Sequence, residues 1–179
     1  MKHKHEGPQL APPVGERDHA QGSASAPVTL VEYGDYECPH CGRAHPILKA
    51  VQKRLGKKLR LVFRNFPLRE MHPNAENAAE AAEAAAAQGK FWQMHDALFE
   101  NQDALALEDL VSYAAEVEID ATRFTAELKA HSHAPRVHED FLSGVRSGVN
   151  GTPTFFLNGT RYDGSWDEDD LVAAIESAP

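Results

Sequence analysis

One short segment, residues 31 to 46 with the sequence VEYGDYECPHCGRAHP, limits most strongly what this chain can fold into. It contains both cysteines of the chain, Cys38 and Cys41. The β-branched and aromatic run at residues 28 to 33 predicts a buried strand before them. The spacing of apolar residues after them predicts a helix over residues 39 to 55. The two thiols are therefore expected at a strand-to-helix junction.

This junction favours redox chemistry of the two thiols. A helix N-terminus carries about half a positive charge and unpaired N–H groups, and both stabilise a thiolate. Cys38, nearer the helix start and solvent, is the expected nucleophile, and Cys41 the buried resolving thiol. Pro39 and His40 lie between them, and this dipeptide is expected to set the redox poise of the pair, with His40 tuning the Cys38 thiolate as a nearby donor. A stable thiolate is a good leaving group, which favours an oxidising dithiol.

Two other interpretations of the cysteines are weaker. A zinc site could use Cys38, Cys41 and His45, but tetrahedral zinc needs a fourth ligand or a water. A structural disulfide between the thiols would close too short a loop to stabilise the fold much. We therefore expect no metal ligands at the dithiol, and we expect His95 to serve helix packing.

Composition excludes several classes of partner. The chain has 179 residues, a net charge of -9 and a sequence pI near 5.5, which argue for one domain and against nucleic acid or an anionic membrane as main partner. No apolar run is long enough to insert into a membrane. The first 26 residues lack the apolar segment of a secretory signal, so a cytoplasmic location is expected, or a periplasmic or secreted one if a signal was removed. We interpret residues 1–26 as a flexible tail.

The remaining pattern predicts an α/β fold. A second strand is expected at residues 57 to 67, followed by a block of helices that includes residues 72 to 89. Asp120 is expected to cap one of these helices. A strand at 154 to 157 leads into Asn158-Gly159, a strong hairpin signal, and a capping box at Ser165 and Glu168 precedes the last helix.

Two motifs together resemble a known family. ECPHCGRAHP, placed after a strand, and GTPTFFLNG near the end of the chain are similar to the DsbA-like branch of the thioredoxin superfamily. The resemblance covers residues 27–179 and implies a thioredoxin-like fold with an inserted all-helical domain at about residues 68–150. The segment AAEAAAAQGKFWQMHDALFE also resembles thioredoxin-like domains attached to some sodium/proton antiporters and their free cytosolic relatives.

The resemblance implies further site residues. Thr152 and Pro153 match the superfamily's cis-proline site, which faces the dithiol and helps to bind an extended substrate. Glu32 matches the buried acid that handles the proton of the resolving Cys41. Strand alternation agrees with burial of this acid, because it places Glu32 on the same face as the apolar Leu30.

These observations predict an enzyme, a thiol–disulfide oxidoreductase that uses its Cys-Pro-His-Cys dithiol on protein or small-molecule thiols and disulfides. A redox partner such as glutathione or a thioredoxin system would reset the pair, and no cofactor is expected. The direction, oxidase or reductase, stays open. The alternative is a redox-sensing regulatory module with little turnover. Glutathione transferase chemistry is disfavoured because it does not need Cys41.

Overall fold

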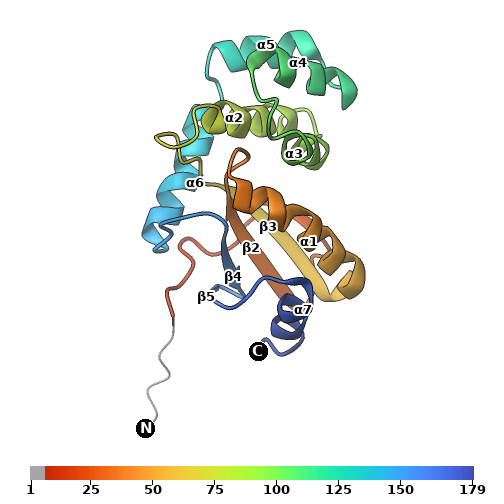
Figure 1. Cartoon of the computed structure of the whole chain (residues 1–179), viewed down its shortest axis with the longest axis vertical. Coiled ribbons are helices and arrows are strands. Elements are labelled where there is room, and N and C mark those ends of the chain that lie inside the picture. The colour runs from red at the N-terminus through yellow and green to blue at the C-terminus, as the bar shows by residue number, and fades with distance from the viewer. Residues whose placement is uncertain (1–6) are drawn as a thin grey trace.

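The computed structural model describes residues 7–179, and its centre is a five-stranded sheet in the order β1-β3-β2-β4-β5 (Figure 1). β2 and β3 are parallel, whereas β1, β4 and β5 each pair antiparallel with a neighbour. The strands are β1 (His19–Gly22), β2 (Val28–Gly34), β3 (Leu59–Asn65), β4 (Thr154–Leu157) and β5 (Thr160–Tyr162). The helices are α1 (Pro39–Leu55), α2 (Ala75–Ala86), α3 (Phe91–Glu100), α4 (Leu107–Glu116), α5 (Ala121–Lys129), α6 (Ala134–Arg146) and α7 (Glu168–Glu176), with a 3-10 turn at Gly56–Lys58.

Both faces of the sheet are covered, as the continuous apolar run of β2 requires. On one face, Leu30 of β2 and Phe155 of β4 belong to a core shared with the buried sides of α1 and α7. On the other face, Val31 and Phe156 pack with Leu10 from the N-terminal segment. This alternation places every second residue of β2, Glu32 included, beneath α1.

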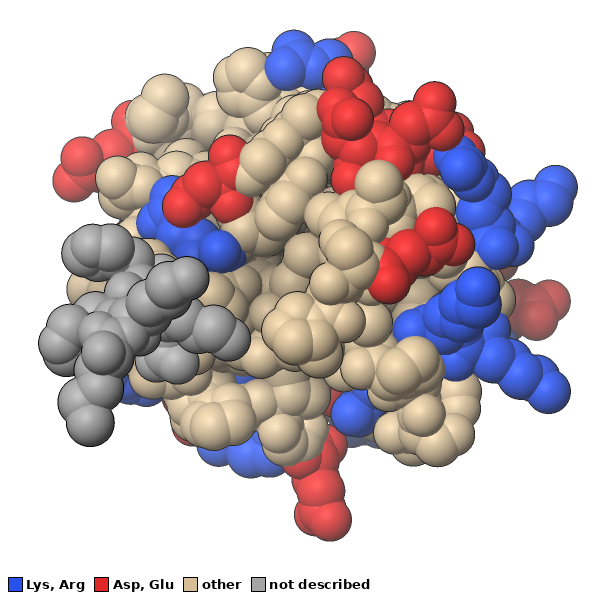
Figure 2. Space-filling model, turned by 90° about the horizontal axis from the view of Figure 1, so that it is seen from below, with Lys and Arg blue, Asp and Glu red and all other residues tan. Residues whose placement is uncertain are grey.

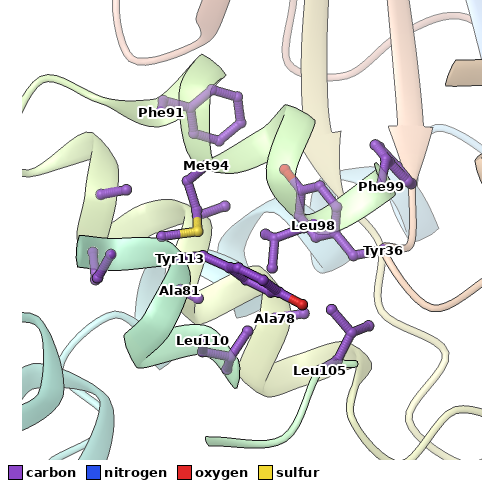
Figure 3. Packing of buried hydrophobic residues seen from close by; sticks show 14 of the residues in the cluster. Tyr36, Ala78, Ala81, Phe91, Met94, Leu98, Phe99, Leu105, Leu110 and Tyr113 are labelled. Carbon is purple, nitrogen blue, oxygen red and sulfur yellow. The ribbon is translucent and has the colours of Figure 1, made fainter. Parts of the chain in front are cut away.

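The helices α2 to α5, which follow β3, build a second core. Figure 1 shows α2 to α5 beyond the end of the sheet where α1 begins. Alanines of α2 pack against larger side chains of α3 and α4, among them Met94, Leu98 and Leu110 (Figure 3). The same buried cluster contains Cys38 and Cys41. The dithiol therefore lies where the sheet layer meets the helical layer.

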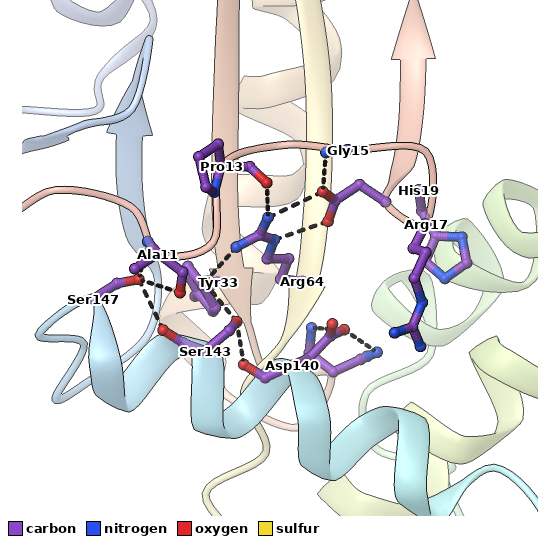
Figure 4. Close-up of polar contacts among 12 residues, drawn as sticks. Ala11, Pro13, Gly15, Arg17, His19, Tyr33, Arg64, Asp140, Ser143 and Ser147 are labelled. Atoms are coloured by element: carbon purple, nitrogen blue, oxygen red, sulfur yellow. Dashed lines mark hydrogen bonds and ion pairs between the residues drawn. The ribbon is translucent and has the colours of Figure 1, made fainter.

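The expectation of a flexible tail over residues 1–26 is wrong for residues 7–26, and residues 1–6 lie outside the described part. β1 pairs with β3, and Leu10 is buried. The Arg64 guanidinium of β3 donates to both carboxylate oxygens of Asp18 at 2.8 and 3.0 Å (Figure 4). Polar contacts of this kind leave no periodic pattern of apolar residues in the sequence. The polar composition of the segment therefore suggested a flexible tail where the chain is in fact held by such contacts.

Asp18→Asn should destabilise the fold by about 3–5 kcal/mol, because it leaves a buried guanidinium without its carboxylate. Arg64 and Asp18 have side-chain exposures of 3% and 8%. Urea unfolding measures the loss. Arg17→Gln is the matched control, since Arg17 pairs with Glu139 at the surface, and a change under about 1 kcal/mol is expected. Equal losses for both variants would contradict a special role for the buried pair.

Two helix caps were predicted, with different outcomes. Asp120 caps α5 as expected, because its Oδ1 accepts from the Arg123 N–H at 3.0 Å. The capping box at Ser165 and Glu168 is wrong. α7 begins at Glu168 with Asp167 as its N-cap, and the Ser165 hydroxyl instead accepts from the Asp167 N–H at 3.2 Å. The serine forms a local turn before the helix starts.

The surface mixes charges of both signs. Figure 2 shows that acidic and basic side chains surround a largely uncharged centre on the lower face of the molecule. Among residues 7–179, no helix combines the length and the hydropathy needed to cross a bilayer.

Candidate active site

The dithiol sits at the first turn of α1, directly after β2. Cys38 is the N-cap of the helix and Pro39 its first residue, a position where the missing N–H of proline is harmless. The Cys38 N–H donates to the Asp35 carbonyl at 3.1 Å, and the Gly42 N–H donates to the Cys38 carbonyl at 3.0 Å. Both cysteines are free thiols, with Cys38 4% exposed and Cys41 fully buried.

Thr152, which precedes Pro153, lies against Cys38, although more than 100 residues separate Thr152 from Cys38 in the chain. The peptide bond between Thr152 and Pro153 is cis. The Cys38 Sγ lies 3.6 Å from the Thr152 carbonyl oxygen. The Thr152 hydroxyl is buried and has no hydrogen-bond partner among the described residues. The turn before β4 therefore places polar atoms of Thr152 beside the Cys38 sulfur.

The surroundings shift the pKa values of the two thiols in opposite directions. The pKa of Cys38 is lowered to about 5, mainly by a hydrogen bond from the Cys41 thiol, which outweighs burial. The backbone N–H groups of Cys41 and His40 add to the lowering, as does the Thr152 hydroxyl, which has no other partner in the described part of the chain and can donate to the thiolate. The pKa of Cys41 is raised well above its usual range by burial, by its bond to Cys38 and by the nearby Glu32. At neutral pH the pair therefore holds one thiolate, on Cys38.

Glu32 is buried beneath α1, as the alternation of β2 predicted. It is 2% exposed, and its Oε1 has no hydrogen-bond partner among residues 7–179. Burial, with a contribution from the charge of Cys38, raises the pKa of Glu32 to about 8. Because Glu32 contributes to the raised pKa of Cys41, the carboxyl and the resolving thiol act on each other electrostatically.

His40 reaches the dithiol differently from the sequence-based prediction. Its imidazole is exposed, and its Nδ1 accepts a hydrogen bond from Arg43 at 2.5 Å. The group of His40 that lowers the pKa of Cys38 is its backbone N–H. A side-chain effect of His40 on the thiolate stays a prediction.

Gln102, in the loop between α3 and α4, is a site residue that the sequence did not reveal. Its side-chain amide donates to the carbonyl oxygens of Tyr36 and Cys38 at 2.9 and 2.8 Å. The amide also lies over Gly42, where an added Cβ would come within 2.0 Å of the Gln102 Oε1. Gln102 therefore fastens the helical insertion to the start of α1. No local signal marks a glutamine 61 residues after Cys41.

Gly42→Ala should mimic Gln102→Ala, because the new methyl group displaces the amide. Each variant should lose about 1–3 kcal/mol of stability, the usual cost when hydrogen bonds to partly buried groups are lost. The double variant should lose little more than either single variant, since both changes remove the same contacts. Urea unfolding of the three proteins tests this. Additive losses would mean that the two residues act independently.

Two acids beside the dithiol hold the segment between β3 and α2. Asp35 accepts from the Leu68 N–H at 2.9 Å and pairs with the His72 ring at 2.8 Å. Glu37 accepts from the Asn74 N–H at 2.7 Å. Burial would lower the pKa of His72, but the hydrogen bond to Asp35 and the negative charges of Asp35, Cys38 and Glu37 together outweigh it and raise the pKa. Sequence reasoning missed this ring, because its partners are distant in the chain.

The zinc interpretation placed Cys38, Cys41 and His45 together, and the structure does not. Among the described residues, the group with ligand atoms close enough to share an ion is His45, His95 and Asp96. Cys41 instead belongs to the apolar cluster of the helical layer.

The rate at which Cys38 is alkylated should rise with pH along a titration curve whose midpoint is near pH 5. The reason is that only the thiolate reacts and the pKa of Cys38 is lowered to about 5. The rate with iodoacetamide should therefore be flat from about pH 6.5 to 8, whereas an ordinary thiol gains reactivity up to about pH 8.5. Thr152→Val removes one hydroxyl donor and should move the midpoint upward. A midpoint above about pH 8 in the wild type would contradict the proposed stabilisation of the thiolate.

The fold and this site define a class, the DsbA-like proteins of the thioredoxin superfamily, as the motif resemblance predicted. Structures of Wolbachia pipientis alpha-DsbA1 and of the thiol–disulfide oxidoreductase MdbA from Actinomyces oris share the fold, at 20% and 23% identity.

The family model described as Thioredoxin matches residues 15–177, and the chain belongs to this family. BdbD from Bacillus subtilis, solved in its oxidised form, aligns with a TM-score of 0.83 and 26% identity over 96% of this chain and 95% of BdbD. A thioredoxin-like oxidoreductase from Silicibacter pomeroyi aligns with a TM-score of 0.79 and 26% identity over 90% and 92% of the two chains.

One curated relative of this chain is a longer protein than the chain itself. The Na(+)/H(+) antiporter NhaA 1 of Salinispora arenicola is 46% identical over 169 residues, which are 94% of this chain and 26% of the antiporter. The chain thus spans about a quarter of the length of the curated relatives that it matches.

Proposed function

We propose that this protein exchanges disulfides with protein thiols through Cys38 and Cys41. The observation that carries the proposal is the geometry of the dithiol. Cys38 is the N-cap of α1, with its sulfur 3.6 Å from the Thr152 carbonyl oxygen, and Cys41 is fully buried one turn further on. These surroundings lower the pKa of Cys38 to about 5 and raise that of Cys41 well above its usual range. The Cys38 thiolate attacks a substrate disulfide and releases one substrate thiolate. Cys41 then loses its proton and attacks the Cys38 sulfur, which frees the second substrate thiolate and leaves the protein disulfide. The reverse sequence oxidises a substrate dithiol.

Glu32 supplies the base for the second step. Two causes raise its pKa, burial and the negative charge on Cys38. When Cys38 enters a mixed disulfide, its charge disappears and the pKa of Glu32 falls. A larger fraction of Glu32 is therefore ionised, and able to accept a proton, at the stage when the buried Cys41 thiol must lose one.

Thr152 holds the substrate beside Cys38. Its carbonyl lies 3.6 Å from the sulfur, and extended peptides bind readily to backbone groups that no strand partner occupies. Small-molecule thiols can react at the same sulfur, and glutathione or a thioredoxin system is the proposed partner that resets the pair.

The reduction potential of the Cys38–Cys41 pair tests the proposal and decides the direction. Equilibration with glutathione buffers and trapping of free thiols measures it. A potential near about -120 mV would indicate an oxidase, and one near about -270 mV a reductase. Absence of a reversible two-electron transition would overturn the proposed exchange.

The antiporter relatives favour a second candidate, a redox-sensing module that regulates a transporter, because 94% of this chain aligns with part of an antiporter. Turnover separates the two candidates. An exchange enzyme reduces a small aromatic disulfide catalytically with glutathione, whereas a sensor reacts once per oxidation event. The cytoplasmic location stays a prediction that cell fractionation can test.

A further inference from the structure

A cluster of three metal-binding side chains lies at the contact between α1 and α3, apart from the dithiol. His45 comes from α1, and His95 and Asp96 come from α3. One ligand atom of each residue lies within 4.8 Å of the ligand atoms of the others. The three side chains line a pocket of about 10 Å³, roughly the space of one water molecule or ion.

The His45 ring is oriented toward this pocket without a hydrogen-bond partner. Its Nε2 is buried and unpartnered among the described residues, and the side chain is 8% exposed. The nearest acidic oxygens are the Oδ1 of Asp96 at 3.6 Å and the Oε1 of Glu100 at 3.9 Å, both beyond hydrogen-bond distance. An unpartnered buried ring nitrogen is costly in free energy, so its placement here points to a ligand.

The other two side chains are oriented by their own partners. The Nδ1 of His95 is hydrogen-bonded to the Tyr36 hydroxyl at 2.9 Å, which leaves its Nε2 available. Lys49 holds the Oδ2 of Asp96 at 2.8 Å, which leaves its Oδ1 facing His45. Such outer hydrogen bonds are typical of metal ligands, because they set the ring tautomer and the orientation of the carboxylate.

The chemistry of the three side chains also suits a zinc ion. A neutral imidazole offers the lone pair of a ring nitrogen as a ligand. Two imidazoles and one carboxylate form a donor set that zinc prefers, with a fourth position for water or Glu100.

We propose that His45, His95 and Asp96 bind a zinc ion that connects α1, the helix of the dithiol, to α3. Tetrahedral zinc needs ligand atoms about 3.3 Å apart, so rotations of these side chains must shorten the widest separation. The ion would replace the missing partner of the His45 Nε2. The proposal does not depend on thiol exchange, since neither cysteine is a ligand.

Zinc titration of the oxidised protein tests the site, because the disulfide prevents zinc binding by the thiols. His3→Gln and His5→Gln are introduced in every protein to remove imidazoles near the N-terminus. Competition with a chromophoric chelator should give one zinc per chain. His45→Gln and Asp96→Asn should each weaken binding by at least about ten-fold. His138→Gln is the matched control, since His138 is exposed, and its affinity should not change.

Cobalt provides a second measurement. Co²⁺ bound by the oxidised protein should give the visible absorption bands of a tetrahedral site with nitrogen and oxygen ligands. His45→Gln and Asp96→Asn should each lose these bands. Circular dichroism checks that the variants fold. If His45→Gln does not fold, Asp96→Asn decides the test alone, because its side chain is 34% exposed. Unchanged zinc affinity in the folded variants, or no saturable binding by the parent protein, would overturn the proposal.

Discussion

Cys38→Ser should abolish turnover, with a loss on the order of 10³-fold or more, because the serine hydroxyl stays protonated where the thiol of Cys38 has a pKa of about 5. Cys41→Ser should instead let the first attack proceed and stop the second. Substrates should then accumulate as mixed disulfides on Cys38, because the thiol that releases them is missing. Disulfide reduction measures the first effect, and non-reducing electrophoresis of protein exposed to a lysate measures the second.

The double variant Cys38→Ser with Cys41→Ser is the control for trapping, and it should capture nothing. Bands that persist in the double variant would not be mixed disulfides of this site. If Cys41→Ser trapped no protein while turnover with a small disulfide remained in the wild type, the substrates would be small molecules. Equal activity of Cys38→Ser and wild type would sink the proposed role of Cys38.

Glu32→Gln should stabilise the reduced protein increasingly as the pH rises from 5 to 8. The folded pKa of Glu32 is raised to about 8, so the folded state keeps a proton that the unfolded state releases above about pH 4.5. In the wild type, Glu32 therefore makes its full contribution to stability at low pH, and this contribution is lost as the pH rises toward 8. The free energy of unfolding of Glu32→Gln, relative to that of the wild type, should therefore increase by up to about 3 kcal/mol between pH 5 and pH 8. Urea unfolding at both pH values measures it.

The same variant should slow the release of mixed disulfides, because glutamine cannot accept the proton of Cys41. Stopped-flow measurement of release across pH separates this effect from stability. Glu80→Gln is the matched control, since Glu80 is a buried acid that pairs with His131 away from the dithiol. Glu80→Gln should leave the release rate unchanged. A Glu32→Gln protein with a normal rate and pH profile would contradict the proton-transfer role.

The local elements around the site could be predicted because their signals are short and strong. The buried run of β2, Pro39 at the start of α1 and the Asn158-Gly159 turn each determine structure over a few residues. The alternation of β2 also predicted that Glu32 is buried, because side-chain direction in a strand follows from position alone. One error was at the N-terminal segment, which Arg64 holds through Asp18 from far along the chain. The other was at the start of α7, where Ser165 forms a local turn in place of the predicted cap.

The sequence by itself determined the local placement of the candidate site residues: two thiols at a strand-to-helix junction and an acid on the buried face of the strand. Only the tertiary structure decided what surrounds them. Thr152 reaches Cys38 and Gln102 reaches the start of α1 because the sheet and the helical insertion close over the dithiol. The opposite pKa shifts of Cys38 and Cys41 arise from burial and hydrogen bonds in that closed arrangement. These interactions depend on distances between atoms far apart in the chain, which neither periodicity nor spacing encodes.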